Sequence, residues 1–226
     1  MNRIAPEALE PGRQASQPAV RIALSGPVGA GKSTLAQALA ARLGVRLIPE
    51  GFAAVQAAIV GRSRLLRNPQ ATDQQMQAGH REAMAACLAW LQGRERVYAE
   101  SGGFVADRWE VDLLDTWLKL FAGLSPDAQT RAILARMREV ARGLDLVVLL
   151  PPPAFDVERF NDEGLPRRPG FSLKLQAYAM TSGLLRQCQG LRVLALPEGQ
   201  PVAARVDAVL RALSRQDSMV SGPGDS

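Results

Sequence analysis

Hydrophobic and polar positions follow two different periods along the chain. Short apolar runs of strand length are typical of buried parallel strands, and longer segments with an apolar residue every three or four positions are typical of amphipathic helices. Strands are predicted over residues 20–25, 45–48, 104–107, 144–150 and 191–196. Helices are predicted between them, over residues 32–43, 52–66, 72–99, 113–121 and 126–140.

Strands that alternate with helices predict one α/β domain, in which a five-stranded parallel sheet is covered by helices on both faces in a three-layer fold. We place this domain at residues 19–213. Residues 1–18 are polar and rich in proline and are expected to be a disordered leader, and residues 214–226 a disordered tail. A polar, arginine-rich segment at 156–170 is interpreted as a flap over one end of the sheet. Ser125 is expected to cap the helix that opens at Pro126.

The most informative motif lies between the first predicted strand and the first predicted helix. It reads Gly-Pro-Val-Gly-Ala-Gly-Lys-Ser-Thr and matches the phosphate-binding loop Gly-x-x-x-x-Gly-Lys-Ser. Glycines let backbone N–H groups approach phosphate oxygens, Lys32 is expected to reach the β and γ phosphates, and Ser33 is expected to bind Mg²⁺. We therefore predict a P-loop NTPase fold that binds ATP and Mg²⁺. The residues assigned to nucleotide binding are Gly26, Val28, Gly29, Ala30, Gly31, Lys32, Ser33 and Thr34.

A carboxylate ends the third predicted strand and is a candidate metal contact. Three apolar residues precede Asp107, so it is expected at the carboxyl end of the sheet, where ligands bind in such folds. The alternative is that Asp107 caps the helix that follows. The next residue is Arg108 and not the glutamate that motor ATPases place there, which argues against rapid ATP hydrolysis. The chain also lacks the Asn-Lys-x-Asp and Asp-x-x-Gly motifs of GTPases.

Composition and charge narrow the function classes. The net charge of +5 suits either nucleic acid or polyphosphate substrates, but the arginines are scattered and form no basic run, so nucleic acid is disfavoured as a partner while staying open. One histidine and two separated cysteines disfavour a zinc site. The N-terminal residues do not resemble a signal peptide, and no apolar run approaches 18 residues, so a cytoplasmic protein without a membrane span is expected.

With these motifs the chain resembles the nucleoside and nucleotide kinases among P-loop proteins. It is most similar to the small, AAA-like ATPase/kinase family that includes the kinase domain of bacterial ribosylnicotinamide kinases. The resemblance rests on the phosphate loop, on Pro49–Glu50 after the second strand, and on Asp107–Arg108 after the third. It implies that Glu50 acts as the base toward an acceptor hydroxyl. The alternative for Glu50 is a carboxylate that interacts with the dipole of the helix beginning at 52.

The resemblance also implies that flap arginines offset charge on the transferred phosphoryl group. The candidates are Arg159, Arg167 and Arg168, of which Arg167 and Arg168 are preferred. Arginine suits this task because its planar guanidinium binds two oxygens at once and keeps its charge.

An acceptor pocket is expected over the carboxyl ends of the strands, between the helices that begin at 52 and 72. Aromatic rings would stack on the acceptor, and amide or guanidinium groups would bind its edges or a phosphate. The candidates are Phe52, Gln74, Gln77, Arg81, Arg108 and Trp109, and His80 is interpreted as a core histidine.

The leading hypothesis is ATP- and Mg²⁺-dependent phosphoryl transfer to a small acceptor, such as a nucleoside, a nucleotide or a related riboside. The alternative is an ATP-dependent switch or slow ATPase that serves a protein or nucleic-acid partner. The sequence leaves a homodimer open.

Overall fold

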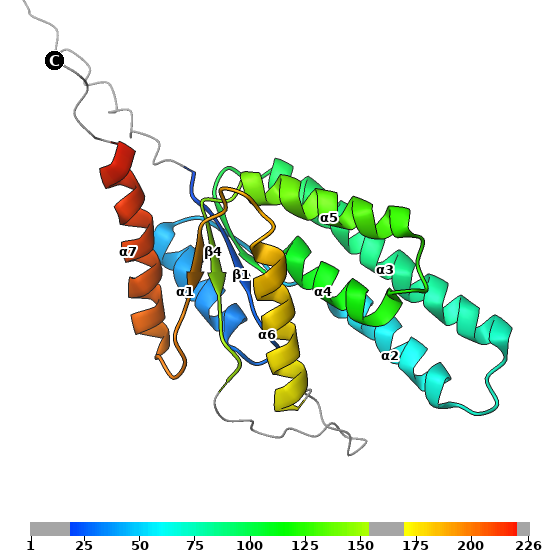
Figure 1. Cartoon of the computed structure of the whole chain (residues 1–226). Coiled ribbons are helices and arrows are strands. Elements are labelled where there is room, and N and C mark those ends of the chain that lie inside the picture. Colours follow the sequence, from blue (N-terminus) through cyan, green and yellow to red (C-terminus); the bar gives the residue numbers. More distant parts are fainter. Residues whose placement is uncertain (1–18, 154–169, 221–226) are drawn as a thin grey trace, which may run out of the picture.

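A parallel sheet forms the centre of the molecule. The computed structural model describes residues 19–153 and 170–220, and only the backbone of residues 216–220. Within these ranges the strands are all parallel and adopt the order β2-β3-β1-β4-β5, as the predicted α/β fold requires (Figure 1). The strands are β1 (Arg21–Ser25), β2 (Arg46–Ile48), β3 (Phe104–Asp107), β4 (Leu146–Leu149) and β5 (Val193–Ala195).

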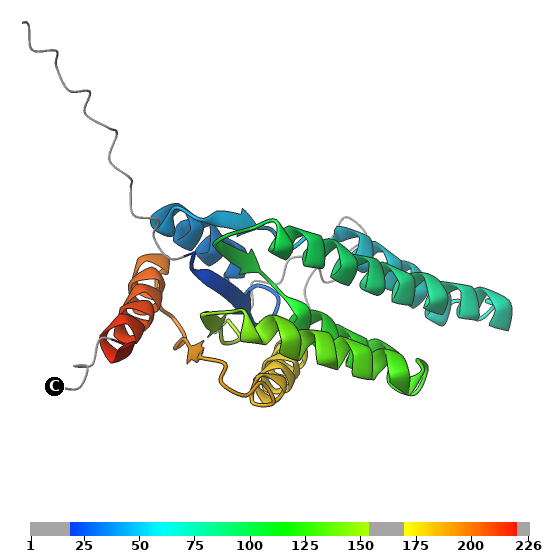
Figure 2. The same ribbon diagram turned by 90° about the horizontal axis from the view of Figure 1, so that it is seen from above.

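Helices cover both faces of the sheet, which confirms the three predicted layers. Helices α1 and α7 pack on one face, and α3, α4, α5 and α6 lie on the other, where α2 and α3 project together beyond the sheet (Figures 1 and 2). The helices are α1 (Lys32–Leu43), α2 (Ala53–Arg67), α3 (Asp73–Ala99), α4 (Glu110–Phe121), α5 (Asp127–Arg142), α6 (Phe171–Leu185) and α7 (Val202–Val220). Among the described helices, none is long and apolar enough to cross a membrane.

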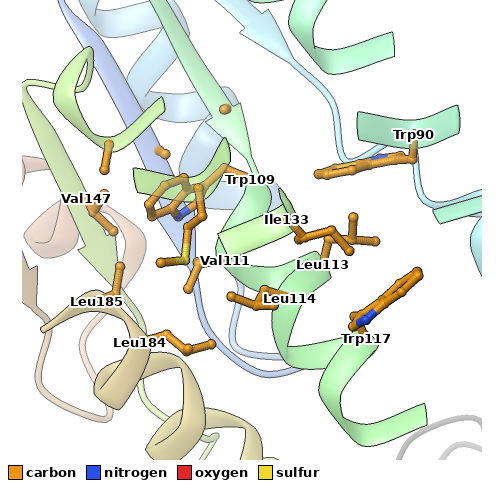
Figure 3. Close-up of a cluster of buried hydrophobic side chains, with 14 of the residues drawn as sticks. Trp90, Trp109, Val111, Leu113, Leu114, Trp117, Ile133, Val147, Leu184 and Leu185 are labelled. Atoms are coloured by element: carbon orange, nitrogen blue, oxygen red, sulfur yellow. The ribbon is translucent and has the colours of Figure 1, made fainter. Parts of the chain in front are cut away.

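The two faces of the sheet build two hydrophobic clusters. Successive strand residues point to opposite faces, so Leu24 packs with α1 and α7 whereas Ala23 packs with the larger cluster. The larger cluster is centred on α4 and on Trp109, which precedes it, and Figure 3 shows Trp109, Leu114 and Trp117 among the buried side chains of this cluster. This core fixes the strand ends that carry the candidate site residues.

Three expectations about the elements need correction. Helix α6 lies in a segment for which we predicted no helix, because its apolar residues are spread around the helix and show no helical period. Helix α7 was not predicted either, and it continues to Val220, so residues 214–220 are helical and not part of a disordered tail. Ser125 does not cap α5. Its hydroxyl instead donates to the carbonyl oxygen of Phe121, and Pro126 occupies the N-cap position. The predicted leader at 1–18 and most of the predicted flap lie outside the described residues.

A carboxyl group is buried at the start of α4. Glu110 is fully buried, and the Tyr98 hydroxyl donates to its Oε2 atom over 3.4 Å. Burial raises the pKa of Glu110 to about 7 from 4.5. A carboxyl whose pKa rises on folding stabilises the protein most when it is protonated, so this contribution is lost as the pH rises from about 4.5 through about 7.

We therefore expect the stability of the Glu110→Gln variant, relative to that of the wild type, to increase as the pH rises. Between pH 5 and pH 8 the difference in the free energy of unfolding should shift by up to about 3 kcal/mol toward the variant. Urea unfolding at both pH values measures this difference. Glu139→Gln is the control for loss of a carboxylate, because the Glu139 side chain is exposed. A difference that does not depend on pH would contradict the assignment.

Candidate functional site

The predicted phosphate loop joins β1 to α1 at the carboxyl end of the sheet. Gly26, Gly29 and Gly31 have φ angles of 139°, 84° and 88°, which glycine adopts without strain. A Cβ atom at Gly26 would lie only 2.5 Å from the carbonyl oxygen of Leu150. Helix α1 begins at Lys32 with no side-chain cap and no acidic residue in its first turn. This N-terminus therefore keeps the backbone donors that bind phosphate oxygens in such loops.

The ammonium group of Lys32 lies inside the curve of the loop. Its Nζ atom donates to the carbonyl oxygens of Gly26 over 2.8 Å and of Pro27 over 3.0 Å, and the side chain is buried. Burial, together with the charge of Arg108 and against the opposing effect of nearby carboxylates, lowers the pKa of Lys32 to about 8. A buried cation with a lowered pKa is stabilised when an anion binds beside it.

Asp107 lies where the sequence predicted, at the end of β3 and beside β1. It pairs in register with Leu24, and its Oδ1 atom is buried without a hydrogen-bond partner. Ser33 is exposed on the first turn of α1. No group of three or more His, Cys, Asp or Glu side chains among the described residues could form a metal site by itself. The oxygen donors Ser33 and Asp107 suit Mg²⁺, which usually takes its other ligands from phosphates and water.

The structure brings Glu50, Phe52 and Arg108 together. Arg108 Nε donates to Glu50 Oε1 over 2.6 Å, and the Arg108 guanidinium lies 5.6 Å from the centre of the Phe52 ring. The Glu50 side chain is 39% exposed whereas that of Arg108 is 12% exposed. Arg108 has a φ angle of 70°, the one positive value for a non-glycine residue within the described ranges. Such an unusual backbone conformation is often found at functional sites.

Trp109 does not lie where we expected. It is fully buried, and its Nε1 atom donates to Ser25 Oγ over 2.8 Å, so it is not available to stack on an acceptor in this structure. Ser25 Oγ in turn donates to Asp112 Oδ2 over 3.0 Å, and Asp112 also binds Arg108 Nη1 over 3.4 Å. Asp112 was not identified from the sequence, although a carboxylate in the first helical turn, three residues after the N-cap, is a recognisable signal.

Gln77 and Arg81 are exposed on the outer half of α3 and stay apart from this cluster. Arg94, on the same helix, reaches Glu50, but the helical rise of about 1.5 Å per residue separates Arg81 from Arg94 by about 20 Å and Gln77 by about 25 Å. His80 faces α2, where its Nδ1 atom accepts from Arg62 Nε over 2.7 Å. The flap candidates Arg159, Arg167 and Arg168 lie outside the described residues.

Two arginines near the site were not identified from the sequence. Arg205 on α7 donates from Nη1 to the carbonyl oxygen of Ala30 over 2.9 Å, across 175 positions of the chain. Arg94 contacts the main chain at the ends of β2 and β3. Neither belongs to a motif or to an apolar period, so no local signal pointed to them.

The geometry agrees with known P-loop proteins. The family described as AAA domain matches residues 21–203. The structure resembles deoxyadenosine kinase from M. mycoides with bound dATP, at 13% identity and a TM-score of 0.56, over 86% of this chain and 99% of that one. The same kinase with bound dCTP gives 14% identity and a TM-score of 0.58, over 87% and 100%. The NadR protein in complex with NAD and AMP-PNP gives 14% identity and a TM-score of 0.53, over 87% of this chain and 50% of that one.

No curated protein matches the sequence. At these identities the likeness to solved structures concerns the fold, which is the α/β P-loop fold that nucleoside kinases share. The family match is more direct, because it spans most of the chain and includes the loop from Gly26 to Ser33. The chain therefore belongs to the AAA domain family of P-loop proteins.

Proposed function

We propose that this protein is a kinase that transfers the γ-phosphoryl group of ATP to a hydroxyl group of a nucleoside, a nucleotide or a related riboside. The observation that carries the proposal is the pair of Glu50 and Arg108, joined over 2.6 Å at the ends of neighbouring strands and beside the Lys32 loop. A partly exposed carboxylate held there can receive a proton from an acceptor. The fold shared with deoxyadenosine kinase supports the same function.

The residues of the loop would hold the donor nucleotide. Backbone N–H groups from Gly29 to Ser33 would bind the phosphate oxygens, and Lys32 would turn from the carbonyl oxygens of Gly26 and Pro27 toward the β and γ phosphates. Ser33 and Asp107 would hold Mg²⁺, which when bound neutralises charge on the β and γ phosphates.

Glu50 would act on the acceptor. Its Oε1 atom is held by Arg108, so the second carboxylate oxygen can accept the proton of the acceptor hydroxyl. The acceptor oxygen forms a bond to the γ phosphorus while the bond between that phosphorus and the β–γ bridging oxygen breaks, and ADP leaves. We place Arg167 or Arg168 of the flap at the transferred group, as the resemblance implied.

Positioning would supply most of the catalysis, because little covalent chemistry is needed from the protein in phosphoryl transfer. Motor ATPases have a glutamate that activates water directly after the strand-end aspartate. This chain has Arg108 at that position, which cannot activate water in the same way. The arrangement therefore favours transfer to an acceptor over hydrolysis.

The test is a panel of acceptors with Mg·ATP and the purified protein. Nucleosides, nucleoside monophosphates and ribosides of other bases are offered one at a time, ADP release is followed, and the product is identified by its added phosphoryl mass. We expect one class of acceptor to raise ADP release by about 10²-fold or more over the basal rate. Stimulation by DNA, RNA or a protein but by no small acceptor would instead support an ATP-dependent switch.

A further inference from the structure

The side chain of Arg94 connects the ends of two neighbouring strands, β2 and β3. Arg94, on α3, is only 5% exposed. Its Nη2 atom lies within hydrogen-bond distance of three main-chain carbonyl oxygens, at 2.8 Å from that of Asp107, 2.7 Å from that of Arg108 and 3.3 Å from that of Glu50. Asp107 and Arg108 end β3, and Glu50 follows β2. The Arg94 side chain therefore binds the backbone of both Glu50, the candidate base, and Asp107, the candidate metal contact.

The main chain of Glu50 has a second donor on the same helix. Trp90 Nε1 donates to the Glu50 carbonyl oxygen over 3.0 Å, and the Arg94 guanidinium lies 4.8 Å from the centre of the Trp90 ring. Trp90 also packs edge-on against the Phe52 ring and is one of the buried side chains in Figure 3. The indole and the guanidinium therefore pack together and bind the same oxygen, which fixes the backbone from which the Glu50 side chain reaches Arg108.

Arg94 also holds the unusual backbone of Arg108. A φ angle of 70° is unfavourable for a residue with a Cβ atom, so surrounding contacts must stabilise it. The Arg108 N–H donates to the carbonyl oxygen of Leu24 over 3.2 Å, and its own carbonyl oxygen accepts from Arg94. These two bonds fix the peptide on both sides, and in this conformation the side chain reaches Glu50 and Asp112.

We propose that Arg94 is a positioning residue that sets the geometry of the Glu50–Arg108 pair and touches neither nucleotide nor acceptor. The inference rests on the proposed function, because it assigns Arg94 a part in phosphoryl transfer. Lysine cannot replace it fully, because an ammonium group lacks the planar, rigid set of donors that lies against the Trp90 ring.

The experiment compares Arg94→Lys and Trp90→Phe with Arg96→Lys, an exposed arginine on the same helix, as the matched control. A displacement of about 1 Å can cost 10²-fold in rate, so we expect kcat to fall by about that factor in Arg94→Lys and by less in Trp90→Phe. The KM for ATP should stay within about twofold, because the phosphate loop is unchanged. In Arg94→Ala, added guanidinium should restore part of kcat.

The charge of Arg94 also stabilises the ionised form of the buried Glu110, so we expect the alanine variant to be less stable, and the lysine variant keeps the test decisive. A kcat within threefold of the wild type in folded Arg94→Lys would overturn the inference. So would a parallel rise in the KM for ATP, which would indicate general disruption of the domain.

A second readout separates failure of this inference from failure of the proposed function. A double-mutant cycle of Arg94→Lys and Glu50→Gln in urea unfolding needs no acceptor. If Arg94 positions Glu50, the shift in unfolding midpoint caused by Glu50→Gln should be smaller in the Arg94→Lys background. Additive shifts would overturn the positioning role, whereas coupled shifts in a protein that phosphorylates no acceptor would contradict the proposed function alone.

Discussion

Replacing Lys32 by alanine is expected to abolish nucleotide binding and phosphoryl transfer while the protein stays folded. The ammonium group is the one side-chain cation inside the phosphate loop among the described residues, and its loss should lower kcat/KM by on the order of 10³-fold. The stability of the folded protein should not fall to the same degree in this variant. Burial lowers the pKa of Lys32 to about 8, so the charged form is less stable in the folded protein than it is in water.

The measurement is the rise in melting temperature that Mg·ADP produces, together with ADP release in the presence of an acceptor. A ligand that binds only the folded state stabilises it by mass action, so the rise should vanish in Lys32→Ala. Lys119→Ala is the control, because Lys119 forms only an ion pair with Asp115, over 2.7 Å, within α4. A full Mg·ADP shift in Lys32→Ala would show that the loop does not bind a nucleotide, and the proposed function would be lost with it.

Replacing Glu50 by glutamine should stop transfer and leave nucleotide binding intact. Glutamine keeps an oxygen that can accept from Arg108 Nε, so the local structure should persist, but it cannot take a proton from the acceptor. General base catalysis contributes about 10²- to 10⁴-fold, and we expect kcat to fall within that range. The KM for ATP and the Mg·ADP shift should match those of the wild type.

Glu95→Gln serves as the control for Glu50→Gln. Glu95 also pairs with an arginine, Arg136, over 3.6 Å, but it lies on the exposed side of α3. Its loss should leave transfer unchanged. Transfer at the wild-type rate in Glu50→Gln would mean that Glu50 only holds Arg108 in place, and another group would have to receive the proton.

Local patterns in the sequence were sufficient for the sheet and for the phosphate loop. Five apolar runs became five parallel strands. The runs of β1, β3 and β4 are buried on both faces, whereas the edge strands β2 and β5 are partly exposed. The loop was predictable because Gly26, Gly31 and Lys32 are neighbours in the chain and act together. Helix α6 was missed for the opposite reason. Its apolar residues are mixed with polar ones on every side of the helix, so the 3.6-residue period that marks a helix is not found.

The acceptor side of the site depends on distances that a pattern does not give. Gln77 and Arg81 have residue types that bind ligands, but a helical period fixes only the face of α3 and not the distance along it. Trp109 was expected to contact an acceptor, yet its indole N–H binds Ser25 inside the core, 84 positions away. Arg94 was missed because its three acceptors are main-chain atoms, which any residue supplies.

The contact between Arg205 and Ala30 links two segments that lie near opposite ends of the described residues. Ala30 belongs to the phosphate loop, and Arg205 on α7, which donates to its carbonyl oxygen, follows 175 positions later in the chain. Until α7 has packed beside α1, the loop lacks this contact. The surroundings of the phosphate loop are therefore complete only when the last described helix is in place.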